Sequence, residues 1–268
     1  MWIPRLSQAG VWLALLALAP FASAQDGGRS LDIEAGSRVA LVIGNAAYEH
    51  ATPLQNPTND ARDIAAALND VGFTVAGYTD LSQDAADADV ALFFYAGHGV
   101  QVNGENYLIP VDADIATERQ MQYNSVPLGE VMGILADAGP RFKMIFLDAC
   151  RDNPFQTWRS SAGGWATPRG PSGSLISFAT SPGDRASDNV EGRNGLFTQA
   201  FLEQITIPGL EVTAMMRGVY NRVMELSDRS QEPWTNSSYG DEFYFLPPSS
   251  PPPGGVPVGG PAPPVALS

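Results

Sequence analysis

The chain has 268 residues, and 44% of them are hydrophobic, which is enough apolar material to build a core and excludes global disorder. Its 29 acidic and 15 basic residues give a formal net charge of -14, so neither nucleic acid nor an anionic membrane is an expected partner. A single cysteine and two histidines exclude an intramolecular disulfide framework and a thiolate zinc site, so any catalysis must use few residues.

The first 24 residues have the composition of a secretory signal peptide. Arg5 supplies the positive charge, residues 11–21 form a short apolar stretch, and residues 22–24 form an Ala-Ser-Ala cleavage site. The alternative is an uncleaved anchor, but the apolar stretch is short for a span of about 20 residues. We therefore expect an exported protein, periplasmic or secreted, with no stable membrane anchor after signal cleavage.

The rest of the chain divides by composition into a linker, a folded unit and a tail. Residues 25–37 form the linker, and residues 38–246 form the folded unit, which shows no internal repeat. Residues 247–268 are rich in Pro and Gly, cannot build a packed core, and are expected to form a disordered tail.

Apolar runs in the folded unit predict buried parallel strands, because these runs are apolar on both faces. Strands are expected at 39–43, 90–95, 144–147 and 175–178, and a weaker one at 73–76. Helical patterns begin with Asn56 as cap of a helix from Pro57 and at Pro127, and cover 196–205 and 212–226. This alternation predicts a three-layer α/β fold with a mostly parallel central sheet and helices on both faces.

Two of these strands end in the two most reactive side chains of the chain. The first leads into a turn with His98 between two glycines, and the second leads to Cys150. Parallel strands place their carboxyl ends at one edge of a sheet, where α/β proteins bind ligands. An imidazole there can act as the base that makes a thiol nucleophilic. The backbone N–H groups of Gly99 and Cys150 are then expected to form an oxyanion hole.

A lone cysteine is most often a small buried hydrophobe, and this alternative applies to Cys150. An unpaired thiol in an exported protein is unusual, however, and glycines on both sides of His98 give access to its ring. His50 has no such setting, because it lies in a loop beside Glu49, and we expect it to be a solvated surface residue.

Three motifs resemble those of the caspase-like cysteine peptidases, specifically the bacterial metacaspase or orthocaspase branch. The 52-residue step from His98 to Cys150 fits the spacing of about 50 found in caspases. The resemblance implies a large-subunit region at 38–155, an exposed loop at 156–174 and a small-subunit region at 175–246. The motifs are Ala-Leu-Val-Ile-Gly-Asn at 40–45, Tyr-Ala-Gly-His-Gly at 95–99 and Asp-Ala-Cys-Arg at 148–151, followed by small-subunit segments at 175–181, 192–197 and 231–234.

The resemblance implies a cysteine endopeptidase that cleaves protein or peptide substrates after Arg or Lys, through a Cys150–His98 dyad and a thioester acyl-enzyme. It also implies that Asp60 and Asp148 form the pocket for the basic residue, since Asn59-Asp60 matches the family motif. Residues two apart in an extended segment face the same way, so Asp148, two residues before Cys150, is placed to lie beside the bound substrate. The alternatives are a helix-dipole interaction for Asp60 and a structural hydrogen bond for Asp148.

Two departures from the family pattern matter. Ala96 stands where many metacaspases carry a serine, which alters at most one supporting hydrogen bond. Residues 79–89 are short for a parallel crossover, so we expect one crossover helix to be missing and the shortened 77–89 crossover to bear on folding or activity. Two other function classes therefore stay open: a catalytically impaired caspase-fold binding or scaffold protein, and another Cys-His amidohydrolase.

The exposed loop carries basic residues available to an Arg-directed enzyme. Residues 155–174 are rich in Gly, Ser, Pro and Arg, so Arg159 and Arg169 are candidate processing sites, with a mobile uncut loop as the alternative. No cofactor and no metal site are assigned, since scattered Asp residues are not a site and no EF-hand loop occurs. The resemblance leaves calcium activation open, because many metacaspases are activated by calcium.

Overall fold

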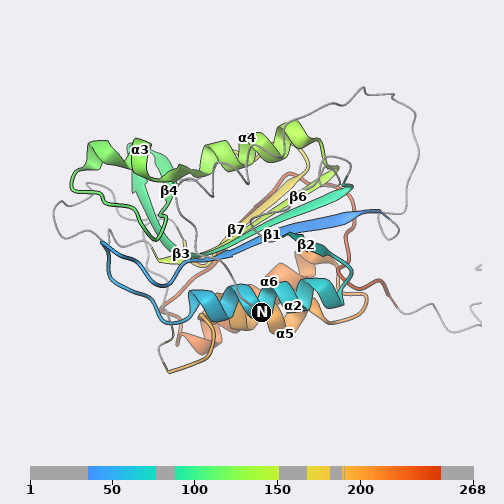
Figure 1. Ribbon diagram of the computed structural model, residues 1–268. Coiled ribbons are helices and arrows are strands. Elements are labelled where there is room, and N and C mark those ends of the chain that lie inside the picture. Colours follow the sequence, from blue (N-terminus) through green and yellow to red (C-terminus); the bar gives the residue numbers. More distant parts are fainter. Residues whose placement is uncertain (1–35, 77–87, 151–167, 182–188, 190, 249–268) are drawn as a thin grey trace, which may run out of the picture.

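The structure is a computed structural model that describes residues 36–76, 88–150, 168–181, 189 and 191–248, apart from the side chain of Cys150 (Figure 1). Its elements in chain order are β1 (Arg38–Gly44), α2 (Pro57–Asp70), β2 (Thr74–Ala76), β3 (Val90–Val102), β4 (Glu105–Leu108), η3 (Glu118–Gln120), α3 (Met121–Asn124), β5 (Val126–Pro127), α4 (Leu128–Ala138), β6 (Phe142–Cys150), β7 (Ser174–Phe178), α5 (Leu196–Ile205), α6 (Val212–Leu226) and β8 (Trp234–Ser237).

The central sheet has the strand order β2-β1-β3-β6-β7-β8. The first five strands in this order run parallel, and β8 pairs antiparallel with β7. Helix α4 covers one face of the sheet, and α2, α5 and α6 cover the other (Figure 1). The predicted three-layer α/β fold with a mostly parallel sheet is therefore confirmed.

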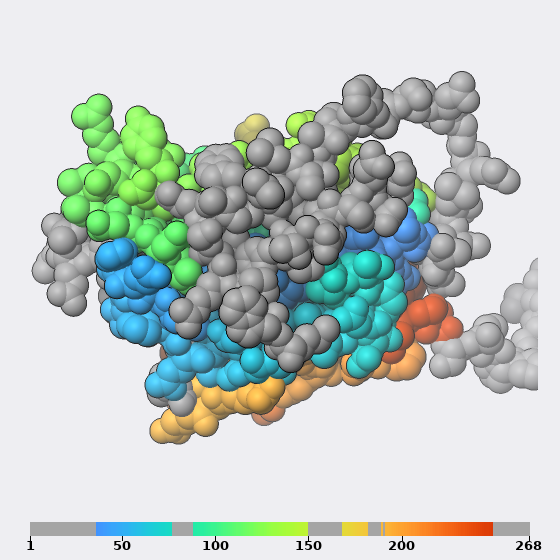
Figure 2. Space-filling model, viewed as in Figure 1, coloured from blue at the N-terminus to red at the C-terminus, as the bar shows by residue number. Residues whose placement is uncertain are grey.

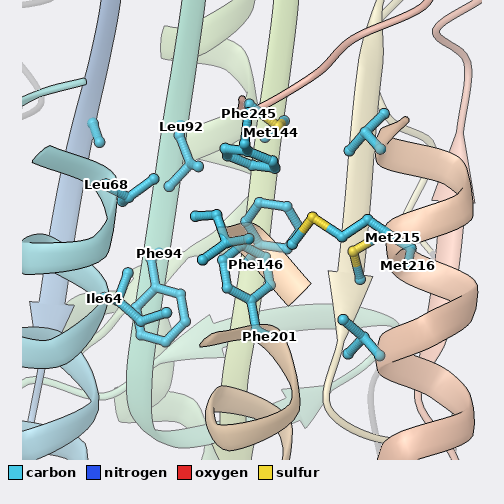
Figure 3. Packing of buried hydrophobic residues seen from close by; sticks show 14 of the residues in the cluster. Ile64, Leu68, Leu92, Phe94, Met144, Phe146, Phe201, Met215, Met216 and Phe245 are labelled. Carbon is cyan, nitrogen blue, oxygen red and sulfur yellow. The ribbon is translucent and has the colours of Figure 1, made fainter. Parts of the chain in front are cut away.

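Alternate residues of the central strands pack against opposite helix layers, as the pleat requires. Phe94 and Phe146 lie in the core shared with α2, α5 and α6 (Figure 3), whereas Phe93 and Ile145 lie in the core under α4. Burying a side chain of this size contributes roughly 1.5–3 kcal/mol. The runs are apolar at almost every position, Ser177 excepted, because both faces are covered, which is why they predict parallel strands so clearly.

Strand β3 is longer than predicted and carries the motif that the sequence placed in a turn. It continues through His98 to Val102, and then turns back into β4 through Asn103 and Gly104, both with positive φ. An Asn-Gly pair between two extended segments is a typical two-residue hairpin turn. The expectation that His98 lies on a loop after the strand is thus wrong, because the hairpin extends the strand beyond the motif.

Strand β4 takes the place of β1 beside the outer half of β3. The pairing of β1 with β3 ends at Gly44 opposite Ala96, and the pairing of β4 with β3 begins at Leu108 opposite Gly99. The loop 45–55 after β1 lies against the segment that follows β4, shown in blue and green in Figure 2, and Glu49 N donates to the carbonyl of Val111 at 2.8 Å.

Several expectations concern residues outside the described ranges. They are the signal peptide, most of the linker, residues 77–87 of the shortened crossover, residues 156–167 of the exposed loop with Arg159, and most of the Pro/Gly-rich tail. Arg169 lies within the described ranges and is exposed. Within the ranges that the structure describes, no helix has the length and apolar character needed to cross a membrane.

Candidate active site

His98 and Cys150 lie opposite one another on neighbouring strands. Their backbones are paired in the parallel ladder between β3 and β6, and Cys150 is the last residue of β6. Adjacent strands are about 4.8 Å apart, so the two residues meet at the carboxyl edge of the sheet. The sequence prediction of a shared edge agrees with this pairing, while the catalytic roles of the two residues stay a prediction.

The imidazole of His98 is buried and hydrogen-bonded through one of its nitrogens. Its Nε2 lies 2.7 Å from the carbonyl oxygen of Thr52, and the residue is 5% exposed. A carbonyl only accepts, so Nε2 must carry the proton of this bond. In the neutral ring Nδ1 is then the basic nitrogen. The role of Thr52 has no sequence signal, because any residue carries a carbonyl group.

The backbone N–H of Gly99 points toward the β6 side of β3. The carbonyl of His98 accepts from Ile109 N at 3.1 Å, on the β4 side. No described peptide bond is cis, and in a trans peptide the N–H points away from the carbonyl. The N–H of Gly99 is therefore directed toward the backbone of β6, and its role as an oxyanion-hole donor stays a prediction.

Asp60 and Asp148 both lie against Gly195, the residue before α5. Oδ1 of Asp60 accepts from Gly195 N at 3.0 Å, and a Cβ on Gly195 would lie 2.7 Å from Oδ2 of Asp148. Oδ2 of Asp148 also accepts from Thr198 N at 3.1 Å and Thr198 Oγ1 at 2.7 Å. Both acids are therefore buried at Gly195, and each accepts hydrogen bonds from the protein, which is the alternative to a binding role.

An ion pair that the sequence analysis missed joins α2 to the segment before α5. Asp63 accepts from Arg193 Nε and Nη2, both at 2.7 Å, and from Asn194 Nδ2 at 3.0 Å. The hydrogen bond from Arg193 is the main reason that the pKa of Asp63 is lowered. This pairing holds the chain next to Gly195, and thus next to both Asp60 and Asp148.

Asn56 and Asn59 extend the same contact along α2. Asn56 precedes the helix, but its side chain makes no capping bond and donates instead to the carbonyl of Asn189 at 2.9 Å. Asn59 donates to the carbonyl of Arg193 at 3.2 Å. Positions 56, 59, 60 and 63 have the spacing of one helix face, which is a signal the sequence does contain. The prediction that Asn56 caps a helix beginning at Pro57 is confirmed, although the amide of Asn56 makes a tertiary contact in place of a capping bond.

The remaining candidate residues have simpler surroundings. His50 is exposed, as the sequence predicts. Among the described residues, no group of three or more His, Cys, Asp or Glu side chains is placed to hold a metal ion.

Three comparisons with known proteins bear on the family. Residues 37–244 match the family model described as "Caspase domain". Residues of this chain are 26% identical over 129 positions to human mucosa-associated lymphoid tissue lymphoma translocation protein 1, and equally to its homolog in Mus musculus; the match covers 44% of this chain and 15% of each relative.

The fold is similar to the crystal structure of caspase-1 from Spodoptera frugiperda, with a TM-score of 0.60, 18% identity, and coverage of 86% of this chain and 99% of that chain. This likeness concerns the fold alone, and the chain spans only 15% of the length of the curated relatives. The family model covers most of the chain. The chain therefore belongs to the caspase-domain family.

Proposed function

We propose that this protein is an endopeptidase that hydrolyses peptide bonds after Arg or Lys, with Cys150 as nucleophile and His98 as base. The observation that carries the proposal is the pairing of these two residues on adjacent strands, at the carboxyl edge of a caspase-family sheet. A thiolate is the nucleophilic form of cysteine, and a neighbouring imidazole is suited to produce it near neutral pH.

The proposed reaction uses the two nitrogens of His98 differently. Nε2–H stays bonded to the Thr52 carbonyl, and Nδ1 accepts the thiol proton of Cys150 while the thiolate attacks the scissile carbonyl carbon. The N–H groups of Gly99 and Cys150 stabilise the resulting oxyanion. His98 then donates the proton to the leaving amine, which leaves a thioester. A water molecule, deprotonated by His98, hydrolyses the thioester and restores the thiol.

The preference for basic residues rests on Asp60 and Asp148. These carboxylates are 2% and 8% exposed, and both lie at Gly195 near the edge where Cys150 ends its strand. Carboxylates near a thiol hinder formation of the thiolate, a cost that a cationic substrate would offset. The guanidinium of arginine can bind carboxylates through two parallel hydrogen bonds that lysine cannot make, so Arg should be preferred over Lys.

Assay of purified protein on fluorogenic Arg, Lys and Asp peptides tests this function. Cys150→Ala and His98→Ala should each abolish turnover while the melting temperature stays near that of the wild type. His50→Ala is the matched control, because His50 is exposed and lies outside the site. Full turnover by Cys150→Ala would exclude the dyad and favour another catalytic site, whereas a wild type inert toward all peptides would favour a scaffold role.

The same assay tests the pocket. Asp60→Asn and Asp148→Asn should each lower kcat/KM on the Arg peptide, by raising KM or lowering kcat, with the fold preserved. If the wild type cleaves Asp and Arg peptides equally well, or both variants keep full Arg activity, the pocket assignment is incorrect. Adding calcium or a chelator in parallel decides whether calcium activates the enzyme.

We also propose that the protein belongs to the metacaspase branch and is exported, periplasmic or secreted, without a membrane anchor. The composition of residues 1–24 supports export, and the match of Asn59-Asp60 to the family motif supports the branch. N-terminal sequencing of the protein from fractionated cells should find Gln25 as the first residue. A mature chain that begins at Met1 would contradict signal cleavage.

A further inference from the structure

His98 lies in a gap of the β-sheet that two tyrosine hydroxyls fill. On this side of β3, β1 ends opposite Ala96 and β4 begins opposite Gly99. His98 N donates to the hydroxyl of Tyr48 at 2.7 Å, and the hydroxyl of Tyr95 donates to the carbonyl of His98 at 2.8 Å. Side chains therefore bind both backbone polar groups of the residue whose ring is the proposed base.

The directions of these hydrogen bonds form a closed ring. The hydroxyl hydrogen of Tyr95 is directed to the carbonyls of His98 and Ile109, at 2.8 and 3.1 Å. In the 3.3 Å contact between the two hydroxyls, Tyr48 must then be the donor. The ring runs from His98 N–H to Tyr48, on to Tyr95, and back to the carbonyl of His98. Hydrogen bonds connected in this way strengthen one another.

Gly97 provides the room for this ring. A Cβ on Gly97 would lie 2.7 Å from the hydroxyl oxygens of both Tyr48 and Tyr95, which is closer than a carbon can approach. The glycine before the histidine is thus needed for the tyrosine contacts, in addition to any access it gives to the active-site edge.

Tyr48 also contacts the imidazole directly. The two ring centroids are 4.5 Å apart with an interplanar angle of 45°, and Tyr48 is 6% exposed. Tyr48 and Thr52 lie on the same loop between β1 and α2, so one loop contacts His98 at its backbone N–H, its ring face and its Nε2. We propose that Tyr48, together with Tyr95, is a positioning residue that fixes the imidazole of His98 in its catalytic orientation; this inference rests on the proposed function of His98.

Kinetics of Tyr48→Phe, Tyr95→Phe and the double variant test the ring. A displaced catalytic base loses rate more than substrate affinity, so Tyr48→Phe should lower kcat by about tenfold or more, with KM within about twofold. Either single substitution opens the ring, so the double variant should lose little beyond either one. Fold-losses that multiply in the double variant, or an unchanged kcat in either single variant, would overturn the ring. Tyr220→Phe is the matched control, because its hydroxyl also makes one hydrogen bond, to Glu232 at 2.8 Å, outside the site.

A spectroscopic readout separates positioning from a merely structural role. The chain has only two histidines, so a His50→Gln background leaves the imidazole of His98 as the only one. Nitrogen-15 spectra should show one tautomer with the proton on Nε2, and Tyr48→Phe should speed the exchange of that proton with water as the Thr52 contact loosens. An unchanged spectrum with a lowered kcat would refute positioning. The spectrum needs no turnover, so it still tests the contact with Tyr48 if the dyad variants disprove the proposed function.

Discussion

Replacing Gly195 by alanine should displace Asp148, one of the two acidic residues that lie against this glycine. A Cβ there would lie 2.7 Å from Oδ2 of Asp148, so the carboxylate must retreat by roughly 0.7 Å to reach the ordinary contact distance of 3.4 Å. Thr198 holds the same oxygen through two hydrogen bonds, at 3.1 and 2.7 Å. The added methyl group therefore competes with these bonds, and Asp148 cannot keep both of them at their present lengths.

The size of the effect follows from the bond at risk. A hydrogen bond to a charged group contributes about 1.5–3 kcal/mol, so losing one should lower the free energy of unfolding by roughly 2 kcal/mol. A domain of this size loses about 2–4 °C of melting temperature per kcal/mol, which predicts a fall of roughly 4–8 °C. Displacing a residue of the proposed pocket should also lower kcat/KM on an Arg peptide by about tenfold.

Thermal unfolding and peptide kinetics on Gly195→Ala measure both quantities, with Gly133→Ala as the matched control. A Cβ at Gly133 would meet nothing within 4 Å, and the residue lies inside α4. Alanine there should stabilise the helix by about 0.5–1 kcal/mol and leave activity unchanged. If Gly195→Ala kept the wild-type melting temperature and kcat/KM, the contact between Gly195 and Asp148 would have no energetic weight and the reasoning would fail.

Two further predictions concern charged residues outside the dyad. Asp63→Asn should raise KM for the Arg peptide, because it weakens the bond from Arg193 that holds the chain beside Gly195. That bond lowers the pKa of Asp63, so the stabilisation that the ionised carboxylate provides is lost as the pH falls below the usual value of 3.8. The difference in unfolding free energy between wild type and Asp63→Asn should therefore shrink below this pH. A difference that stays constant with pH would contradict this prediction. Burial lowers the pKa of Lys143 below its usual 10.5 and so penalises the protonated amine in the fold. The penalty fades as the pH rises through the lowered pKa toward 10.5, so wild type should gain stability relative to Lys143→Met between pH 7 and 10.5. Denaturant titrations at several pH values measure the two free energies of unfolding, and an equal change with pH in both proteins would disprove this.

Local patterns in the sequence were sufficient for the layers of the fold and for placing His98 and Cys150 at one edge of the sheet. A strand buried on both faces is apolar at nearly every position, and a helix on the sheet is apolar on one stripe, so both leave a pattern that can be read directly from the sequence. Both rules depend on neighbours within about one element. Once the strands are recognised as parallel, their carboxyl ends must lie at one edge of the sheet, which is how the sequence indicated that His98 and Cys150 share that edge.

The tertiary structure alone decided which groups surround that edge. Asp63 and Arg193 are 130 residues apart, and His98 and Tyr48 are 50 apart, so only the packing of α2 and of the loop 45–55 brings these partners together. Their contacts involve hydroxyls, amides and backbone carbonyls, which leave no periodicity in the sequence. The hairpin after His98 differs, because it has a local signal in the Asn-Gly pair at 103–104 and pairs residues close in sequence. Periodicity records which side of an element is buried, and the identity of the group that buries it is set only when the layers pack.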